Sequence, residues 1–197
     1  MAQGVRAMWQ KQSGTAFGWD ATFRNGQWDY LASLGEMPRY ALIAGYIRHF
    51  ARTGAVLDAG CGQGILFEHL DDRSVAYSGF DVSATAIAEA RRRAPGARLS
   101  VCSADEYQPD GRFDVVVFNE VLPHVDDPLG TLDRFIHFLN PQGLVILSLY
   151  QSRDQQAKAV VLTGMLENEI AIGRYAVLAK STVENEAELK WTIYCLR

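Results

Sequence analysis

Residues 56–64 read Val-Leu-Asp-Ala-Gly-Cys-Gly-Gln-Gly, a short apolar run that ends in an acidic residue and then passes through three alternating glycines. The run over 55–59 predicts a buried strand, and a helix begins at Ile65. Glycine adopts positive φ and has no Cβ, so a ligand can approach the backbone of such a bend closely. Ligands of open α/β sheets bind at the carboxyl ends of strands, next to helix N-termini. The segment therefore predicts a ligand-binding loop between a strand and a helix.

The spacing of the glycines separates this loop from two other nucleotide-binding loops. A dinucleotide loop follows G-x-G-x-x-G, and counting from Gly60 or Gly62 places Ile65 or Phe67 where the last glycine would stand. A P-loop ends in Gly-Lys-Ser/Thr, and residues 58–64 contain no lysine. The order here is D-x-G-x-G-x-G, which argues against a nicotinamide-dependent oxidoreductase but leaves it as an alternative.

Short apolar runs and helical patterns alternate along the chain. Helical periodicity covers residues 29–51, and Ser83 is the expected N-cap of a later helix. The further expected strands are 75–81, 98–102, 113–118 and 143–149, and the expected helices are 65–70, 84–93 and 128–139, the last closed by Asn140-Pro141. This alternation predicts an α/β, doubly wound, mostly parallel sheet.

The C-terminal third has a different pattern. Residues 155–172 read as helical or irregular, and 174–183 and 189–196 read as two strands joined by a short polar turn. Such a hairpin adds an antiparallel strand at the end of the sheet. We therefore expect seven strands in total.

Composition suits one compact domain. The chain has 197 residues, of which 48% are hydrophobic, and a net charge of −4, whereas a nucleic-acid binder is more often basic. The cysteines Cys61, Cys102 and Cys195 are far apart and lack CxxC spacing, so we expect neither disulfide nor metal site. No apolar run approaches the ~18 residues of a membrane span, and no signal peptide is visible. A cytoplasmic protein with no nucleic-acid or membrane partner is the expectation.

The loop resembles motif I of the class I, Rossmann-like S-adenosylmethionine-dependent methyltransferases, and the resemblance runs from about Gly54 to Arg197. It implies S-adenosylmethionine as cofactor and methyl transfer to a small-molecule acceptor, through O- or N-methylation in a biosynthetic pathway. It also implies a methyltransferase domain over 54–197, preceded by an arm and helix over 1–53 that form a lid and substrate region. A catalytically inactive methyltransferase-like partner subunit is a second alternative. Oligomeric state stays open.

The resemblance also implies roles for acidic residues at the strand ends. Asp58 faces the methionine ammonium, although a buried aspartate that satisfies loop amides is equally compatible with the pattern. Asp81 accepts both ribose hydroxyls, with a helix cap as the alternative, and Asp105 accepts the adenine amino group, with the same alternative. The expected cofactor-binding residues are Asp58, Gly60, Cys61, Gly62, Gly64, Asp81, Val82, Ala104, Asp105, Asn119 and Arg39.

The segment 119–128 follows the fourth expected strand, and in the family this loop faces the transferring methyl group. His124 is a candidate general base, because an unperturbed imidazole has a pKa of ~6.5. It could instead pack against the cofactor, cap the next helix or bind substrate. Glu120 is the second candidate base, limited by the cost of burying an unpaired carboxylate.

The first thirty residues are rich in aromatic side chains and show no clear period, so 1–28 is interpreted as a flexible or lid-like arm. Aromatic rings can enclose a sulfonium by cation–π contact or stack on a flat substrate, and they can equally pack the following helix onto the sheet. Arg39 could form a fork with the cofactor carboxylate or lie on the surface. The expected substrate-contacting residues are Trp19, Trp28, Tyr30 and Tyr150.

Overall fold

A seven-stranded sheet runs through the centre of the molecule in a computed structural model that describes residues 16–51, 54–70, 75–154 and 157–197. The strands are β1 (Ala55–Ala59), β2 (Ala76–Asp81), β3 (Arg98–Val101), β4 (Phe113–Asn119), β5 (Leu139–Tyr150), β6 (Val177–Glu184) and β7 (Lys190–Leu196). The α-helices are α2 (Ala16–Arg24), α3 (Met37–Phe50), α4 (Ile65–Glu68), α5 (Ala84–Arg93), α6 (Pro128–Ile136) and α7 (Lys158–Ala171). Two 3-10 helices, η1 (Asp29–Ala32) and η2 (Leu122–His124), complete the set among the described residues.

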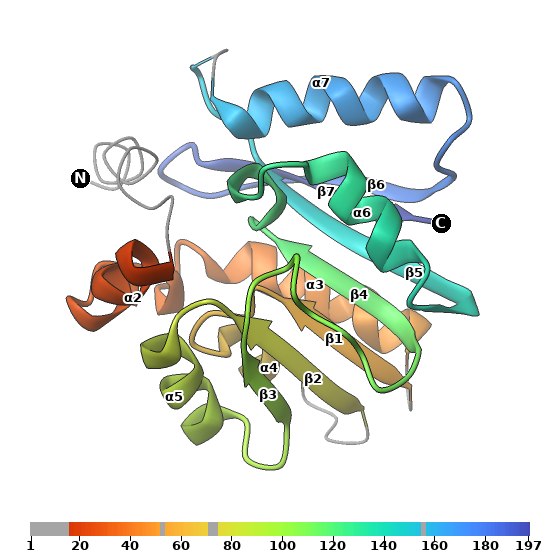
Figure 1. The fold of residues 1–197 in the computed structure, drawn as a ribbon. Coiled ribbons are helices and arrows are strands. Elements are labelled where there is room, and N and C mark those ends of the chain that lie inside the picture. Colours follow the sequence, from red (N-terminus) through yellow and green to blue (C-terminus); the bar gives the residue numbers. More distant parts are fainter. Residues whose placement is uncertain (1–15, 52–53, 71–74, 155–156) are drawn as a thin grey trace.

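The strand order is β3-β2-β1-β4-β5-β7-β6. The first five strands in this order are parallel, and β7 pairs antiparallel with both β5 and β6. Figure 1 shows helices in front of and behind the sheet. The predicted fold class, a doubly wound and mostly parallel sheet of seven strands with a C-terminal antiparallel hairpin, is therefore confirmed.

Alternate side chains of the central strands enter two separate cores. Leu57, Val116 and Leu147 pack with residues of α6 and α7 on one face of the sheet. Val56 and Val117 pack with residues of α3 and α4 on the other. This arrangement explains the unbroken apolar runs of β1 and β4, because a strand covered on both faces needs apolar residues at every position.

The helix expected over 128–139 is shorter than predicted. Helix α6 ends at Ile136, and Leu139 already pairs with Phe113 of β4 as the first residue of β5. Arg112 donates a hydrogen bond of 2.7 Å to the carbonyl of Leu139. The extension of the helix to Leu139, and its closure by Asn140-Pro141, were therefore wrong, because a pairing across the sheet overrides the local helical pattern.

The N-terminal region is more regular than its sequence indicates. Residues 16–24 form α2, although the arm over 1–28 showed no period; residues 1–15 and 52–53 of the expected lid region lie outside the described residues. The helical pattern over 29–51 divides into η1 and α3, with Pro38 in the first turn of α3, where its missing N–H has no cost. No helix within the described ranges is long and apolar enough to cross a membrane.

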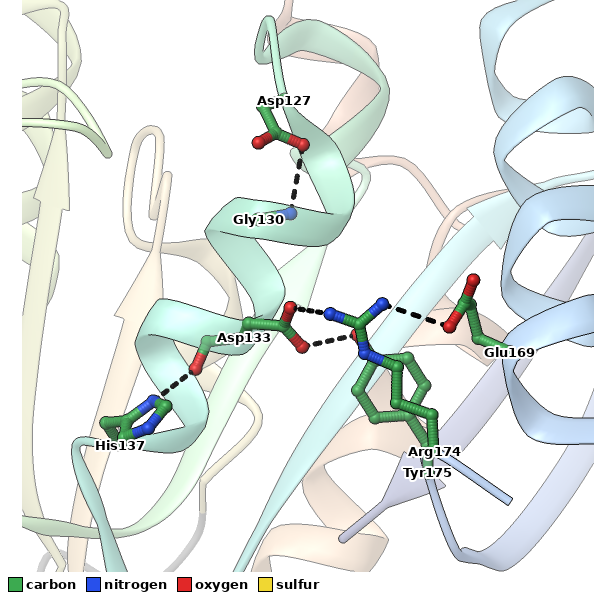
Figure 2. A network of polar contacts seen from close by, with 7 residues as sticks. All are labelled: Asp127, Gly130, Asp133, His137, Glu169, Arg174 and Tyr175. Carbon is green, nitrogen blue, oxygen red and sulfur yellow. Dashed lines mark hydrogen bonds and ion pairs between the residues drawn. The ribbon is translucent and has the colours of Figure 1, made fainter. Parts of the chain in front are cut away.

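A polar network joins α6 to the segment that follows α7 (Figure 2). The carboxylate of Asp133 accepts a hydrogen bond of 2.6 Å from the hydroxyl of Tyr175, a residue only 3% exposed, and pairs with Arg174. Arg174 also pairs with Glu169 at 3.0 Å. Asp127 caps α6 by accepting from the Gly130 amide at 3.0 Å. The network therefore fixes α6 and α7 on the same face of the sheet.

Replacement of Asp133 by alanine leaves the Tyr175 hydroxyl without its acceptor, so we expect the free energy of unfolding to fall by about 1–3 kcal/mol. The Tyr175→Phe variant should lose less, because it removes the donor together with the need for an acceptor. Urea unfolding of both single variants and the double variant measures the coupling, expected to be about 1 kcal/mol. Additive losses would show that the contact does not stabilise the fold.

Candidate functional site

A cavity of about 400 Å³ opens at the carboxyl ends of β1, β2 and β4. Helix α2 and the segment up to Tyr30 form part of its wall. The predicted residues that line it are Trp19, Trp28, Tyr30, Arg39, Asp58, Gly60, Cys61, Gly62, Asp81, Val82, Ala104, Asn119, Glu120, His124 and Tyr150. Gly64 and Asp105 are the two predicted site residues that do not line it.

The glycine bend has the left-handed backbone that its sequence predicts. Gly60 has φ of 67°, and a Cβ there would lie 2.5 Å from Cγ2 of Val121, inside van der Waals contact. Gly64 has φ of 77° at the N-cap of α4, and a Cβ there would lie 3.1 Å from Cα of Ala90 in α5. Gly64 therefore lets two helices approach each other, whereas Gly60 brings the loop after β4 against the bend.

Asp81 ends β2 and lines the cavity with a carboxylate that the loop already binds. Its Oδ2 accepts a hydrogen bond of 3.0 Å from the Gly62 amide, and its Oδ1 accepts one of 2.9 Å from the Ser83 amide. Burial raises its pKa to about 6, and these amides act in the opposite direction by stabilising the charge. The carboxylate is thus held in a fixed orientation at the cavity wall.

Asp58 is the penultimate residue of β1, lies near Asp81 and is 2% exposed. Its Oδ2 accepts a hydrogen bond of 2.5 Å from the hydroxyl of Tyr77. Burial raises the pKa of Asp58 to about 7, the Tyr77 hydrogen bond opposes that shift, and the charge of Asp81 adds to it. A cation in the cavity would stabilise the ionised form, because opposite charge favours it.

Arg39 lies in the first turn of α3 with 1% of its surface exposed, so the surface alternative for this residue is excluded. It pairs with buried Glu36 at 2.8 Å, donates to Oδ1 of Asn119 at 3.0 Å and lies over the ring of Tyr40. Its buried Nε has no hydrogen-bond partner among the described residues. Sequence reasoning missed Glu36, although its i,i+3 spacing from Arg39 was a visible signal.

Four aromatic residues from α2 and the segment after it form what we call the aromatic wall, namely Trp19, Phe23, Trp28 and Tyr30. Trp19 and Trp28 stack with ring centroids 5.6 Å apart, and Trp28 lies 5.9 Å from Phe23 and 6.0 Å from Tyr30. The hydroxyl of Thr22 accepts from Nε1 of Trp28 at 2.8 Å and donates to the Trp19 carbonyl at 2.7 Å. These contacts hold the rings at the cavity rather than in the core of the sheet.

Both candidate bases follow β4. Glu120 has φ of 65°, a strained backbone for a residue with a Cβ, and strain of this kind often marks functional sites. Its carboxylate accepts hydrogen bonds of 3.1 Å from the Ser148 hydroxyl and from the Tyr150 amide. The carboxylate is therefore anchored to β5.

His124 lines the cavity with an exposed surface, and its ring lies edge-on to Trp19 at 4.9 Å. Desolvation of the ring by the surrounding protein, followed by the positive charge of Lys158, lowers the pKa of His124 below its usual range. The imidazole is therefore neutral at pH 7 and can accept a proton, and the lowered pKa makes it a weaker base than a free imidazole.

The cavity is also lined by residues that follow β3 and β5. Ala104 lines the cavity, whereas the neighbouring Asp105 is exposed and does not line it. Contact of either residue with the cofactor stays a prediction. Phe23 also lines the cavity, although it was not among the expected site residues. So do Ser152, Arg153, Asp154 and Ala159 of the segment beyond β5. The available signal was their place after the carboxyl end of a central strand.

Comparison with known proteins agrees with this geometry. A family model described as a methyltransferase domain matches residues 35–187. The ubiquinone biosynthesis O-methyltransferase of Rhodopseudomonas palustris (strain BisB5) is 32% identical over 113 residues, which are 55% of this chain and 44% of that protein. The chain thus aligns with less than half the length of this relative.

Two solved structures share the fold. The 1,6-didemethyltoxoflavin-N1-methyltransferase of Burkholderia thailandensis superposes with a TM-score of 0.73 at 21% identity, over 94% of this chain and 87% of that one. It holds 1,6-didemethyltoxoflavin and S-adenosylhomocysteine. The N-methyltransferase NodS of Bradyrhizobium japonicum WM9, with S-adenosylhomocysteine bound, gives a TM-score of 0.70 at 16% identity, over 90% and 97%.

The family model covers well over half of the chain, and the fold agrees with that of solved methyltransferases over nearly all of it. The predicted family and the predicted cofactor, S-adenosylmethionine, are confirmed. A cavity with a glycine bend and two buried strand-end carboxylates stands where such a fold binds its ligand. This chain belongs to the class I, Rossmann-like S-adenosylmethionine-dependent methyltransferases.

Proposed function

We propose that this chain transfers the methyl group of S-adenosylmethionine to a small-molecule acceptor, by O- or N-methylation in a biosynthetic pathway. The observation that carries the proposal is one cavity that joins the buried carboxylates of Asp58 and Asp81 to an aromatic wall. Relatives and structural neighbours named as O- and N-methyltransferases of small molecules support the reaction type.

The cofactor would lie along the ends of β1 and β2. Asp81 would accept its ribose hydroxyls, and Val82 and Ala104 would contact the adenine. Asp58 would face the ammonium, and Arg39, whose side chain lines the cavity, would face the carboxylate. Asn119 is already oriented by its hydrogen bond from Arg39.

The acceptor would enter between the aromatic wall and the loop after β4. When bound, S-adenosylmethionine supplies a methyl group on a positively charged sulfur. Trp19 and Tyr30 offer ring faces that can stabilise that charge or stack on a planar acceptor. Because methyl transfer is an in-line displacement, the chief task of these walls is to hold the nucleophile opposite the departing sulfur.

His124 would act as the general base for an acceptor that carries a proton on its nucleophilic oxygen or nitrogen. Its neutral imidazole takes that proton, the nucleophile forms a bond to the methyl carbon, and the carbon–sulfur bond breaks with its electron pair left on sulfur. The products are the methylated acceptor and S-adenosylhomocysteine. Glu120, anchored to β5, would shape the loop and is the second candidate for this role.

Calorimetry should detect binding of S-adenosylhomocysteine to the purified protein. The Asp81→Ala variant should bind it at least about tenfold more weakly, because the ribose loses an acceptor that is fixed in place, and tenfold corresponds to about 1.4 kcal/mol. Asp110→Ala, which changes an exposed aspartate outside the cavity, is the matched control. Absence of binding, or preferential binding of a nicotinamide cofactor in the same assay, would refute the proposal.

The affinity for S-adenosylhomocysteine should depend on pH. Asp58, whose pKa is raised to about 7, is protonated below that pH and then cannot pair with an ammonium. We expect affinity to fall about tenfold between pH 8 and pH 6, since one pKa unit corresponds to tenfold in the ionised fraction. The Asp58→Asn variant should bind weakly, with only the dependence of about twofold over this range that Asp81 leaves, because its pKa is about 6. A wild-type affinity that does not change between these pH values would contradict the role of Asp58.

The base role of His124 can be separated from cofactor binding. Once a screen of phenols and amines with labelled S-adenosylmethionine identifies an acceptor, His124→Ala should lower kcat about 100-fold. The dissociation constant of S-adenosylhomocysteine should change by less than about twofold. His49→Ala, an exposed histidine of α3, is the control. Unchanged turnover in His124→Ala would assign the proton transfer to another group or to water.

A further inference from the structure

Helix α2 lies at one end of the molecule beside α5, and not against the sheet (Figure 1). It nevertheless supplies Trp19 and Phe23 to the aromatic wall. A nine-residue helix is too short to be stable alone, so its position depends on contacts with the rest of the protein. Those contacts therefore determine whether the aromatic wall covers the cavity.

The chief polar contact of α2 with the rest of the fold is made by Asp20. Its Oδ1 accepts a hydrogen bond of 2.8 Å from the Thr85 amide and one of 2.9 Å from the Ser83 hydroxyl. Thr85 lies in the first turn of α5, where amides have no partner within the helix and negative charge is favoured. The Thr85 amide lowers the pKa of Asp20 despite some desolvation, so the carboxylate is charged at neutral pH.

Ser83 connects this contact to the proposed ribose site. Its amide donates to Oδ1 of Asp81 at 2.9 Å, while its hydroxyl donates to Asp20 and also accepts from the Ala86 amide. One serine therefore binds the carboxylate of the helix over the cavity and the carboxylate of the cavity floor. Val82, between Asp81 and Ser83, lines the cavity itself.

The position of Asp20 in α2 links the contact to the aromatic wall. Trp19 precedes it, and the rings of Trp19 and His124 lie edge-on with their centroids 4.9 Å apart. Phe23 lies three residues further on, nearly one helical turn, and its ring would be 3.6 Å from a Cβ on Gly62. A shift of Asp20 would therefore move both rings away from the glycine bend.

We propose that Asp20 is a positioning residue that latches α2 to the first turn of α5 and so holds the aromatic wall closed over the cofactor. The inference rests on the proposed function, since the enclosed molecule is S-adenosylmethionine or its product. When the Asp20 contact to Ser83 and Thr85 breaks, Trp19 and Phe23 move away from the cavity, and the product leaves faster. Asp20 therefore sets the rate at which S-adenosylhomocysteine dissociates, without contact with the reacting atoms.

The first measurement needs no ligand. Hydrogen exchange of the amides of residues 20–25 should become at least about tenfold faster in Asp20→Ala, because the latched helix opens more often, while amides of β4 keep their protection. Asp20→Asn retains an acceptor oxygen and should restore most of the protection. Arg24→Ala removes the exposed i,i+4 ion-pair partner of Asp20 but leaves the Ser83 and Thr85 contacts in place, so exchange should change by less than about threefold.

The second measurement is the dissociation rate of S-adenosylhomocysteine, followed by stopped-flow tryptophan fluorescence. We expect an increase of about tenfold in Asp20→Ala, a smaller one in Asp20→Asn and none in Arg24→Ala, with association little changed. Unchanged exchange, or faster exchange with an unchanged dissociation rate, in a folded Asp20→Ala protein overturns the latch. If wild type binds no S-adenosylhomocysteine, the proposed function fails, and the latch as a closure over the cofactor is overturned with it, whatever the exchange rates show.

Discussion

The burial of two carboxylates at the ends of adjacent parallel strands is the constraint on which the site depends. Because β1 and β2 pair in parallel, their carboxyl ends lie at the same edge of the sheet. This pairing brings the carboxylates of Asp58 and Asp81 close together. An unpaired buried charge is costly, and the fold responds with the Tyr77 hydroxyl on one carboxylate and loop amides on the other. The glycine bend contributes the Gly62 amide to this compensation. Both carboxylates line the cavity, and a positively charged ligand there would stabilise their ionised forms.

Much of the fold could be predicted from the sequence, because many of its strands, helix caps and turns are determined by neighbouring residues. The apolar runs of β1 and β4, the capped helix α5 and the polar turn before β7 each depend on neighbouring residues. The end of α6 was not readable in this way. Leu139 belongs to a strand because it pairs with Phe113. The two residues are far apart in the sequence, so the local helical periodicity around Leu139 does not reveal this pairing.

The same distinction applies to the site. The acidic residues at the strand ends and the glycines could be predicted from their positions along the chain. The burial of Arg39 could not, because it depends on a contact with Asn119, 80 residues away. The placement of the aromatic wall depends on Asp20 and Ser83, 63 residues apart. Composition showed that the N-terminal segment was aromatic, but only tertiary contacts decide whether such rings face a ligand or a core. Asp105 is the converse case, a residue in the expected place along the chain whose side chain is exposed and does not line the cavity.

The insertion of β7 between β5 and β6 has a consequence for how the protein is made. Both neighbours of β7 precede it in the chain, so a ribosome that has synthesised the residues up to 189 has produced two strands that lack their shared partner. At that moment β5 presents an open edge, with the apolar residues Val145 and Leu147 along it. Such edges invite pairing between chains. The nascent polypeptide is therefore most prone to aggregation shortly before β7 emerges, and it is at this stage that a chaperone would be of most use.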